Sequence, residues 1–126
     1  MHEFRYHDNQ LFCEDVDVDR LAAAVGTPFY LYSAGTLRRH FDQLEALFAE
    51  LDPLVCFSAK ACANLHVIET LVAAGAGVDV VSGGELYRAL AAGADPAAIV
   101  FAGVGKSHDE LGQAFDACIG CLNVES

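Results

Sequence analysis

The sequence predicts an α/β protein built around a parallel sheet. Short apolar runs alternate with longer amphipathic stretches, and the centres of the runs recur every 20 to 24 residues, the length of one strand plus one covering helix. Two of the amphipathic stretches are followed by Gly75 and Gly93, where the left-handed residue after a helix belongs. A doubly wound sheet and a (β/α)8 barrel of about 250 residues both show such a repeat. Only four clear units follow the first helix, so a barrel would be represented by its first half.

The composition is that of one globular domain with an acidic surface. The chain has 126 residues, 54% of them hydrophobic, and a formal net charge of −11. Because the basic residues form no cluster, we expect no nucleic-acid partner. No apolar run approaches about 20 residues and the first residues do not resemble a signal peptide, so we expect no membrane partner and a cytoplasmic location. The five cysteines fit small buried side chains in a reducing compartment.

Residues 1–35 are expected to form a separate segment of hairpin, short helix and strand. Apolar and polar residues alternate on both sides of a turn at 8–10, which is typical of a hairpin. Asp17 is placed to cap a short helix, and Gly26 is placed to end it. The aromatic and aliphatic run 29–32 predicts a further strand.

Residues 36–126 carry the repeat of helices and strands. Apolar side chains at steps of four and three residues predict a first helix that packs on the sheet: Leu37, Phe41, Leu44, Phe48 and Leu51. The expected strands are 54–59, 78–82, 99–103 and 121–125. Helices are expected after the first three of these, at 64–74, 83–92 and 107–118.

The residue that most suggests chemistry is Lys60, on the loop after strand 54–59. Asn64 can cap the following helix, which places Lys60 at the carboxyl end of a buried strand, where α/β sheets collect ligands. A lysine held there among apolar side chains is poorly hydrated, which favours the neutral amine and makes Lys60 a candidate Schiff-base former. The alternative is a solvated loop lysine, since most lysines are exposed. These residues alone leave both interpretations open.

A second polar group follows at the end of the next strand. Asp79 lies inside the apolar run 77–81, so its carboxylate needs a hydrogen bond or a cation, and the neighbouring strand ends at Lys60. Ser82 and Glu85 have the spacing of a capping box, in which each satisfies a free amide of the helix start. The alternative is that this amide-rich helix start holds an anion.

Two other stretches resemble functional motifs but do not match them. The stretch 103–107 reads Gly-Val-Gly-Lys-Ser, but Val100 stands where a phosphate-binding loop has its first glycine. Lys106 is therefore expected to be a solvated loop residue. Cys118 and Cys121 have redox or metal-ligand spacing, but they lack a second cysteine pair.

The stretch Phe57-Ser58-Ala59-Lys60-Ala61-Cys62 resembles the cofactor-lysine segment of the alanine-racemase-like, fold type III pyridoxal phosphate enzymes. Among these, the chain is most similar to the diaminopimelate decarboxylase family. Further stretches carry the likeness in the family's order and spacing: residues 13–16, 26–33, 36–39, 78–90 and 123–126. The resemblance covers essentially the whole chain but only about the first third of a family member.

The resemblance implies a fold, a site and a reaction. Residues 36–126 would be the first part of a TIM (β/α)8 barrel, truncated after about four βα units, and residues 1–35 would join the C-terminal β-domain of a full-length homodimer. Lys60 would be the catalytic lysine that carries pyridoxal 5'-phosphate, with Asp79 and Glu85 as further cofactor-binding residues. The reaction would convert a small amino-acid substrate, meso-2,6-diaminopimelate, into L-lysine and CO2, the last step of lysine biosynthesis.

The chain also departs from the family pattern. Cys62 stands where the family usually has asparagine, and the phosphate-binding loops and C-terminal β-domain are absent. We therefore expect the 126 residues alone to be inactive. Two alternatives remain: another fold type III enzyme, such as an ornithine or arginine decarboxylase or an amino-acid racemase, and a non-catalytic fragment that binds pyridoxal phosphate.

Overall fold

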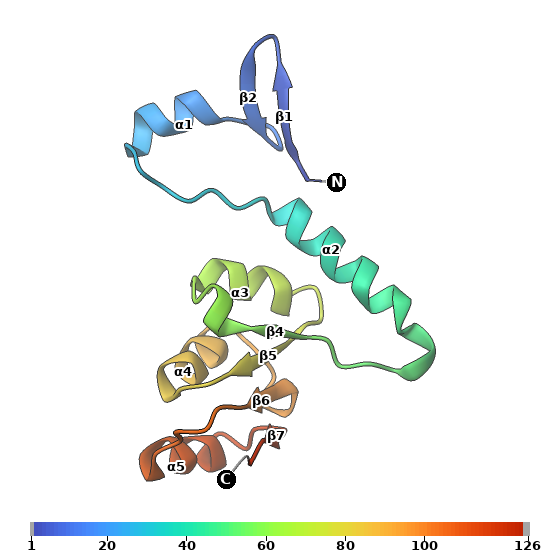
Figure 1. The fold of residues 1–126 in the computed structure, drawn as a ribbon, viewed down its shortest axis with the longest axis vertical. Coiled ribbons are helices and arrows are strands. Elements are labelled where there is room, and N and C mark those ends of the chain that lie inside the picture. Colours follow the sequence, from blue (N-terminus) through green and yellow to red (C-terminus); the bar gives the residue numbers. More distant parts are fainter. Residues whose placement is uncertain (1, 125–126) are drawn as a thin grey trace.

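The computed structural model describes residues 2–124, which form a small antiparallel part followed by a parallel α/β part (Figure 1). The antiparallel sheet has the order β1-β2-β3, with β1 (Phe4–His7), β2 (Gln10–Cys13) and β3 (Val16–Asp17). The parallel sheet has the order β4-β5-β6-β7, with β4 (Cys56–Ser58), β5 (Gly77–Val80), β6 (Ile99–Phe101) and β7 (Cys121–Leu122).

The N-terminal part confirms the predicted hairpin and helix but not the predicted strand. The hairpin turns at Asp8 and Asn9, both with positive φ, and α1 (Val18–Val25) begins at Asp17, whose carboxylate accepts two backbone N–H groups. The strand predicted at 29–32 is wrong, because residues 26–33 run from α1 to the next helix without pairing with any described strand. An apolar run becomes a strand only where a neighbouring strand accepts its hydrogen bonds.

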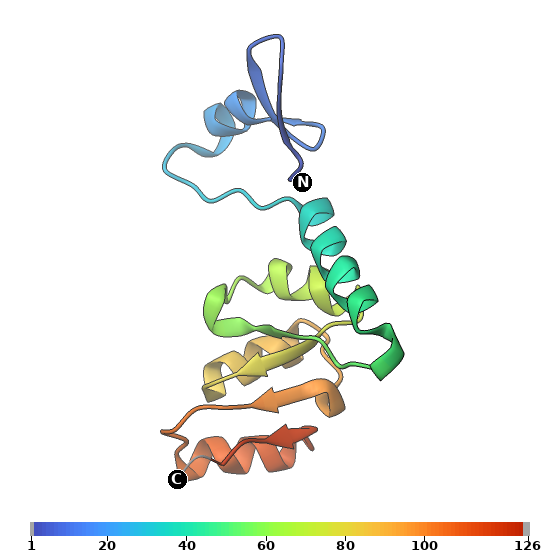
Figure 2. The ribbon, with the colours of Figure 1, turned by 45° about the vertical axis from the view of Figure 1, so that its right-hand side comes forward.

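The first long helix packs on another helix rather than on the sheet. It is α2 (Ala34–Leu47), capped by Ser33 and followed by a short 3-10 helix, η1 (Ala49–Leu51). Phe41 is buried against residues of α3 (Leu65–Val72), and both views show α2 lying beside α3 (Figure 1, Figure 2). Leu51, the last residue of the predicted stripe, is 76% exposed. The expectation that the whole stripe would pack on the sheet is therefore wrong: Leu37 and Phe41 join the cluster with α3, and the later side chains of the stripe are exposed.

The parallel sheet confirms the predicted repeat, with shorter strands. All three strand pairs are parallel, and α3, α4 (Gly83–Ala91) and α5 (His108–Asp116) follow β4, β5 and β6 in turn. Gly75 and Gly93 have positive φ after α3 and α4, as predicted. The last strand covers only two residues of the predicted 121–125, and residue 125 lies outside the described residues.

The hydrophobic core lies on one face of this sheet. Val78, Val80, Ile99 and Phe101 are completely buried and form one cluster with buried side chains of the helices, such as Leu86. Burial of one such side chain contributes about 1.5–3 kcal/mol. Because strand residues alternate between faces, the residues between them lie on the opposite face, where the described residues form no comparable buried cluster.

The cysteines are less buried than expected. All five are free thiols, and of these only Cys13 is buried, whereas Cys118 and Cys121 are exposed. The prediction that the cysteines are mainly small core residues is therefore wrong. Burial, together with the charges of Glu14 and Glu3, raises the pKa of Cys13. Within the described part of the chain, none of the helices combines the length and hydropathy needed to cross a membrane.

Candidate functional site

The carboxyl ends of the parallel strands bring three residues that the sequence analysis considered to one edge of the sheet. Lys60 lies in a short 3-10 helix, η2 (Ala59–Ala61), directly after β4. Ser82 begins α4 just after β5, and Lys106 lies in the loop after β6. Parallel strands end at the same edge, so the topology brings these three residues to one edge of the sheet. The side-chain contacts decide what each can do.

Lys60 is an accessible amine. Its side chain is exposed, while the adjacent Ala59 is completely buried and anchors η2 to the core. Within residues 2–124, the Lys60 ammonium has no hydrogen-bond or ion-pair partner. The expectation that apolar neighbours strip this lysine of water is therefore wrong, because Lys60 is exposed within η2. An exposed and unpaired amine is nevertheless free to react with a carbonyl compound.

The Asp79 carboxylate is hydrogen-bonded to a hydroxyl group on the neighbouring strand. Ser58 stands opposite Asp79 in the register of β4 and β5, and Ser58 Oγ donates a hydrogen bond to Asp79 Oδ2 over 2.9 Å. Within residues 2–124, Asp79 and Lys60 form no ion pair. Sequence reasoning missed Ser58; the signal available was its place two residues before Lys60, at the end of the strand.

The start of α4 is only partly the predicted capping box. Ser82 Oγ accepts a hydrogen bond from the Glu85 N–H group over 3.2 Å, as predicted. The Glu85 carboxylate instead accepts from the Val81 N–H group over 2.9 Å, one residue before the cap. The Gly83 N–H group donates to Glu110 Oε1 over 2.8 Å. An internal carboxylate therefore already occupies part of the helix start that was considered for an anion.

Glu110 joins the starts of two helices. Its second oxygen, Oε2, accepts from the N–H and the hydroxyl of Ser107 over 2.9 and 3.0 Å, which completes a capping box at α5. The N–H groups of Ser107 and Gly83, followed by the Ser107 hydroxyl, lower the pKa of Glu110. The spacing of Ser107 and Glu110 signals the capping box, but only the fold brings Gly83 to the same carboxylate.

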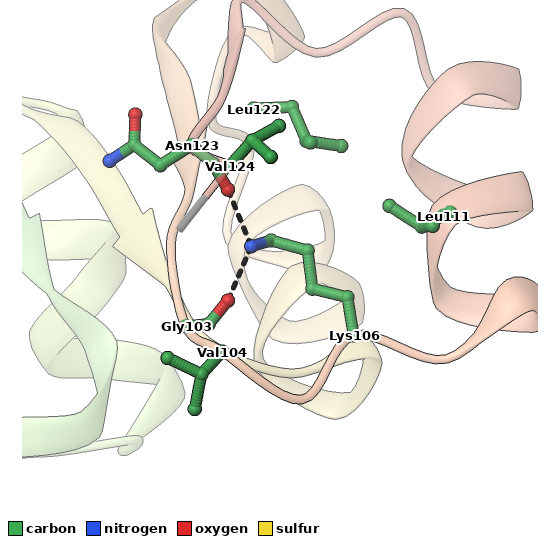
Figure 3. Close-up of a pocket in the computed structure, with 7 residues that line it drawn as sticks. All are labelled: Gly103, Val104, Lys106, Leu111, Leu122, Asn123 and Val124. Atoms are coloured by element: carbon green, nitrogen blue, oxygen red, sulfur yellow. Dashed lines mark hydrogen bonds between the residues drawn. The ribbon is translucent and has the colours of Figure 1, made fainter. Parts of the chain in front are cut away.

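The Lys106 side chain is hydrogen-bonded to the protein backbone. Its Nζ donates to the carbonyl oxygens of Gly103 and Asn123 over 2.5 and 2.6 Å (Figure 3), and it lies 5.7 Å from the centre of the Phe101 ring. It thereby ties the ends of β6 and β7 together beside an open pocket that Leu111 also lines. The prediction of a solvated loop lysine is wrong. Of the chain's two lysines, the free one is Lys60.

The other groups considered from the sequence are metal ligands and cysteines. Among residues 2–124, no three His, Cys, Asp or Glu side chains are grouped as metal ligands. Cys118 follows the C-cap of α5 with a φ of 55°, and Cys121 lies in β7. Cys62, at the end of η2, is half-buried. The edge therefore offers a free amine, a carboxylate held by a hydroxyl group and a carboxylate held by a backbone amide.

Comparison with known proteins gives one consistent result. Residues 34–126 match the sequence family described as pyridoxal-dependent decarboxylase, pyridoxal binding domain. Along the whole chain, it is 44% identical over 126 residues to the diaminopimelate decarboxylase of Haemophilus influenzae, of which it covers 30%. It is 51% identical over 116 residues, 92% of its length, to the enzyme of that name from Neisseria meningitidis serogroup A, of which it covers 29%.

Solved structures agree with these relatives. The crystal structure of diaminopimelate decarboxylase from M. jannaschii in complex with L-lysine superposes with a TM-score of 0.93 at 32% identity. The superposition covers 98% of this chain and 30% of that one. The chain thus spans about 30% of the length of the proteins it matches.

Proposed function

The chain belongs to the family of pyridoxal-dependent decarboxylases, and on this premise we propose that it acts as the N-terminal part of a diaminopimelate decarboxylase whose cofactor lysine is Lys60. The reaction proposed is the decarboxylation of meso-2,6-diaminopimelate to L-lysine and CO2. The observation that carries this proposal is the identity of 44% and 51%, over nearly the whole chain, to proteins of that name. A role in lysine biosynthesis follows from the same likeness, and we propose the cytoplasm as its location.

Lys60 suits the role of the lysine that holds the cofactor. Its amine is exposed and unpaired at the carboxyl end of β4, so an aldehyde can reach it, while buried Ala59 fixes the backbone beside it. Pyridoxal 5'-phosphate, when bound, supplies an electron sink for the loss of a carboxylate, and the protein supplies orientation and charge. Lys106 is a poor alternative because two backbone carbonyl groups hold its ammonium.

Asp79 and Glu85 are proposed as the acidic residues beside the cofactor. Asp79 lies near the carboxyl end of β5 and Glu85 lies in the first turn of α4, at the same edge of the sheet as Lys60. Both residues are half-buried. Asp79 presents a negative charge at the end of β5, where it favours a proton on a neighbouring nitrogen. The Glu85 carboxylate holds the Val81 N–H group, so it fixes the backbone at the point where β5 enters α4.

The architecture proposed for the working enzyme is larger than the described sheet. Residues 36–126 would form the first half of a (β/α)8 barrel, in which the outer strands β4 and β7 gain neighbours. Residues 1–35 would pack with a C-terminal β-domain of a homodimer. The support is the parallel order β4-β5-β6-β7 with its core on one face, since the other face of a barrel strand turns to the barrel interior.

Reductive trapping tests the role of Lys60. The purified chain is mixed with pyridoxal phosphate and borohydride, which reduces the bond formed between an amine and the aldehyde, and peptides are mapped by mass spectrometry. We expect the adduct on Lys60 and much less on Lys106, the matched control. Equal labelling of the two lysines, or labelling of Lys106 alone, would contradict the assignment.

A turnover assay tests the reaction itself. A protein of the relatives' length that contains these residues is expected to release lysine from meso-diaminopimelate, and a Lys60→Ala variant is expected to lose this activity. Ornithine and arginine serve as competing substrates. Faster decarboxylation of either would favour another fold type III enzyme. The 126-residue chain alone is expected to be inactive, and appreciable turnover would show that expectation to be wrong.

A further inference from the structure

The hydroxyl of Ser58 and the carboxylate of Asp79 form a pair across β4 and β5. The two residues are opposite one another in the register, and the hydrogen bond between them measures 2.9 Å. Their chain neighbours Phe57 and Val78 belong to the cluster on the helix-covered face. Because successive strand residues face opposite sides, the Ser58–Asp79 pair lies on the face away from the helices.

The neighbouring residues show that the Asp79 carboxylate lies along this open face. Cys56 and Gly77 precede the pair by two residues on each strand, and a Cβ built on Gly77 would lie 2.8 Å from Cys56 Sγ. Burial raises the pKa of Cys56, and the negative charge of Asp79 raises it further. Within residues 2–124, Ser58 is the hydrogen-bond partner of Asp79, and its bond is to Oδ2. The other oxygen, Oδ1, accepts no hydrogen bond from the described residues.

We propose that Ser58 is a positioning residue for the cofactor lysine and that it acts through Asp79. Lys60 follows Ser58 by two residues at the same end of β4. The hydroxyl that holds Asp79 Oδ2 therefore also sets the direction of Oδ1 relative to the amine. A carboxylate held in one rotamer presents its charge at one place, whereas a free one divides its time among several. The inference rests on the proposed function of Lys60 and deepens it.

Two variants of Ser58 separate the effect of the hydroxyl group from the effect of side-chain shape. Both variants add a methyl group, but Ser58→Thr keeps the hydroxyl whereas Ser58→Val has a second methyl group in its place, and both β-branched side chains suit a strand. The probe is pyridoxal phosphate with borohydride, and the readout is the ratio of adduct at Lys60 to adduct at Lys106 across a series of pH values. We expect Ser58→Thr to keep the native ratio within about twofold. We expect Ser58→Val to change the ratio by about threefold or more and to displace its pH profile, because an effect of this size corresponds to the loss of one hydrogen bond.

A double-mutant cycle shows whether the effect passes through Asp79. In an Asp79→Asn background, Ser58→Val is expected to change the ratio no further, because the charge being positioned is already absent. An undiminished effect of Ser58→Val in that background, or equal ratios for the Thr and Val variants, would overturn the proposal. Far-UV circular dichroism monitors folding, and Ser58→Ala replaces the valine variant if the latter does not fold.

The same data distinguish this inference from the proposed function. A native chain that gives no adduct on Lys60 would refute the role of Lys60 itself, and with it the positioning role of Ser58. A native chain that labels selectively at Lys60, with a ratio unaffected by Ser58→Val, would refute the positioning role alone.

Discussion

The sheet leaves no room for a side chain at Gly77. It begins β5, the strand that carries Asp79, and it is buried. A Cβ built there would lie 2.5 Å from the carbonyl oxygen of Ala98 and 2.8 Å from Cys56 Sγ, whereas real Cβ atoms essentially never come within 3.0 Å. The sulfur could move by a rotamer change, but the carbonyl oxygen is backbone. Gly77→Ala must therefore push β5 away from the segment that leads into β6.

The cost of Gly77→Ala is that of an overpacked core. Such changes cost about 1–3 kcal/mol, and the backbone clash places this one at about 2 kcal/mol. For a chain of 126 residues, that corresponds to a fall in Tm of roughly 8 °C. Urea unfolding followed by far-UV circular dichroism measures the change. Adding Cys56→Ala should restore little, because the contact with the Ala98 carbonyl remains.

Gly112→Ala is the matched control for Gly77→Ala. Gly112 lies inside α5, and an added Cβ would meet no atom within 4 Å. Since alanine suits a helix interior better than glycine, this variant should gain about 0.5–1 kcal/mol. If Gly77→Ala were as stable as the native chain to within about 0.5 kcal/mol, the argument from close approach at β5 would be refuted.

Two further predictions concern polar contacts that cross between elements. The N–H of Gly35, the hydroxyl of Ser33 and the charge of Arg38 lower the pKa of Glu14, so the carboxylate stabilises the fold above its ordinary pKa, and that stabilisation is lost as the pH falls through the lowered value. Glu14→Gln should cost about 1 kcal/mol near neutral pH and flatten the acid side of the stability curve measured by urea unfolding; an unchanged curve would contradict this. Lys106→Met should cost about 1–2 kcal/mol and speed hydrogen exchange in β7, whereas unchanged exchange there would show that its two carbonyl contacts do not hold the strand.

Local sequence signals succeeded where the interaction that they report spans one turn of chain. Asp17 and Asn64 cap α1 and α3 by accepting from N–H groups two and three residues ahead, so the identity of each residue and its place before an apolar stretch were sufficient. The spacing of strands and helices likewise predicted a parallel sheet. The run 29–32 failed as a strand for the opposite reason, because strand formation depends on a partner that the run itself does not contain.

The sequence by itself therefore determined the order of elements, the helix starts and the edge of the sheet at which Lys60 lies. Only the tertiary structure decided which polar groups meet there. The hydrogen bonds there join residues far apart in the sequence: Ser58 and Asp79 are separated by 21 residues, Glu110 and Gly83 by 27, and Lys106 and Asn123 by 17. Hydrogen bonds act over about 3 Å, so such pairings depend on strand register and on the turn that each loop makes. That is also why Lys60, placed correctly along the chain, proves to be exposed rather than surrounded by apolar side chains.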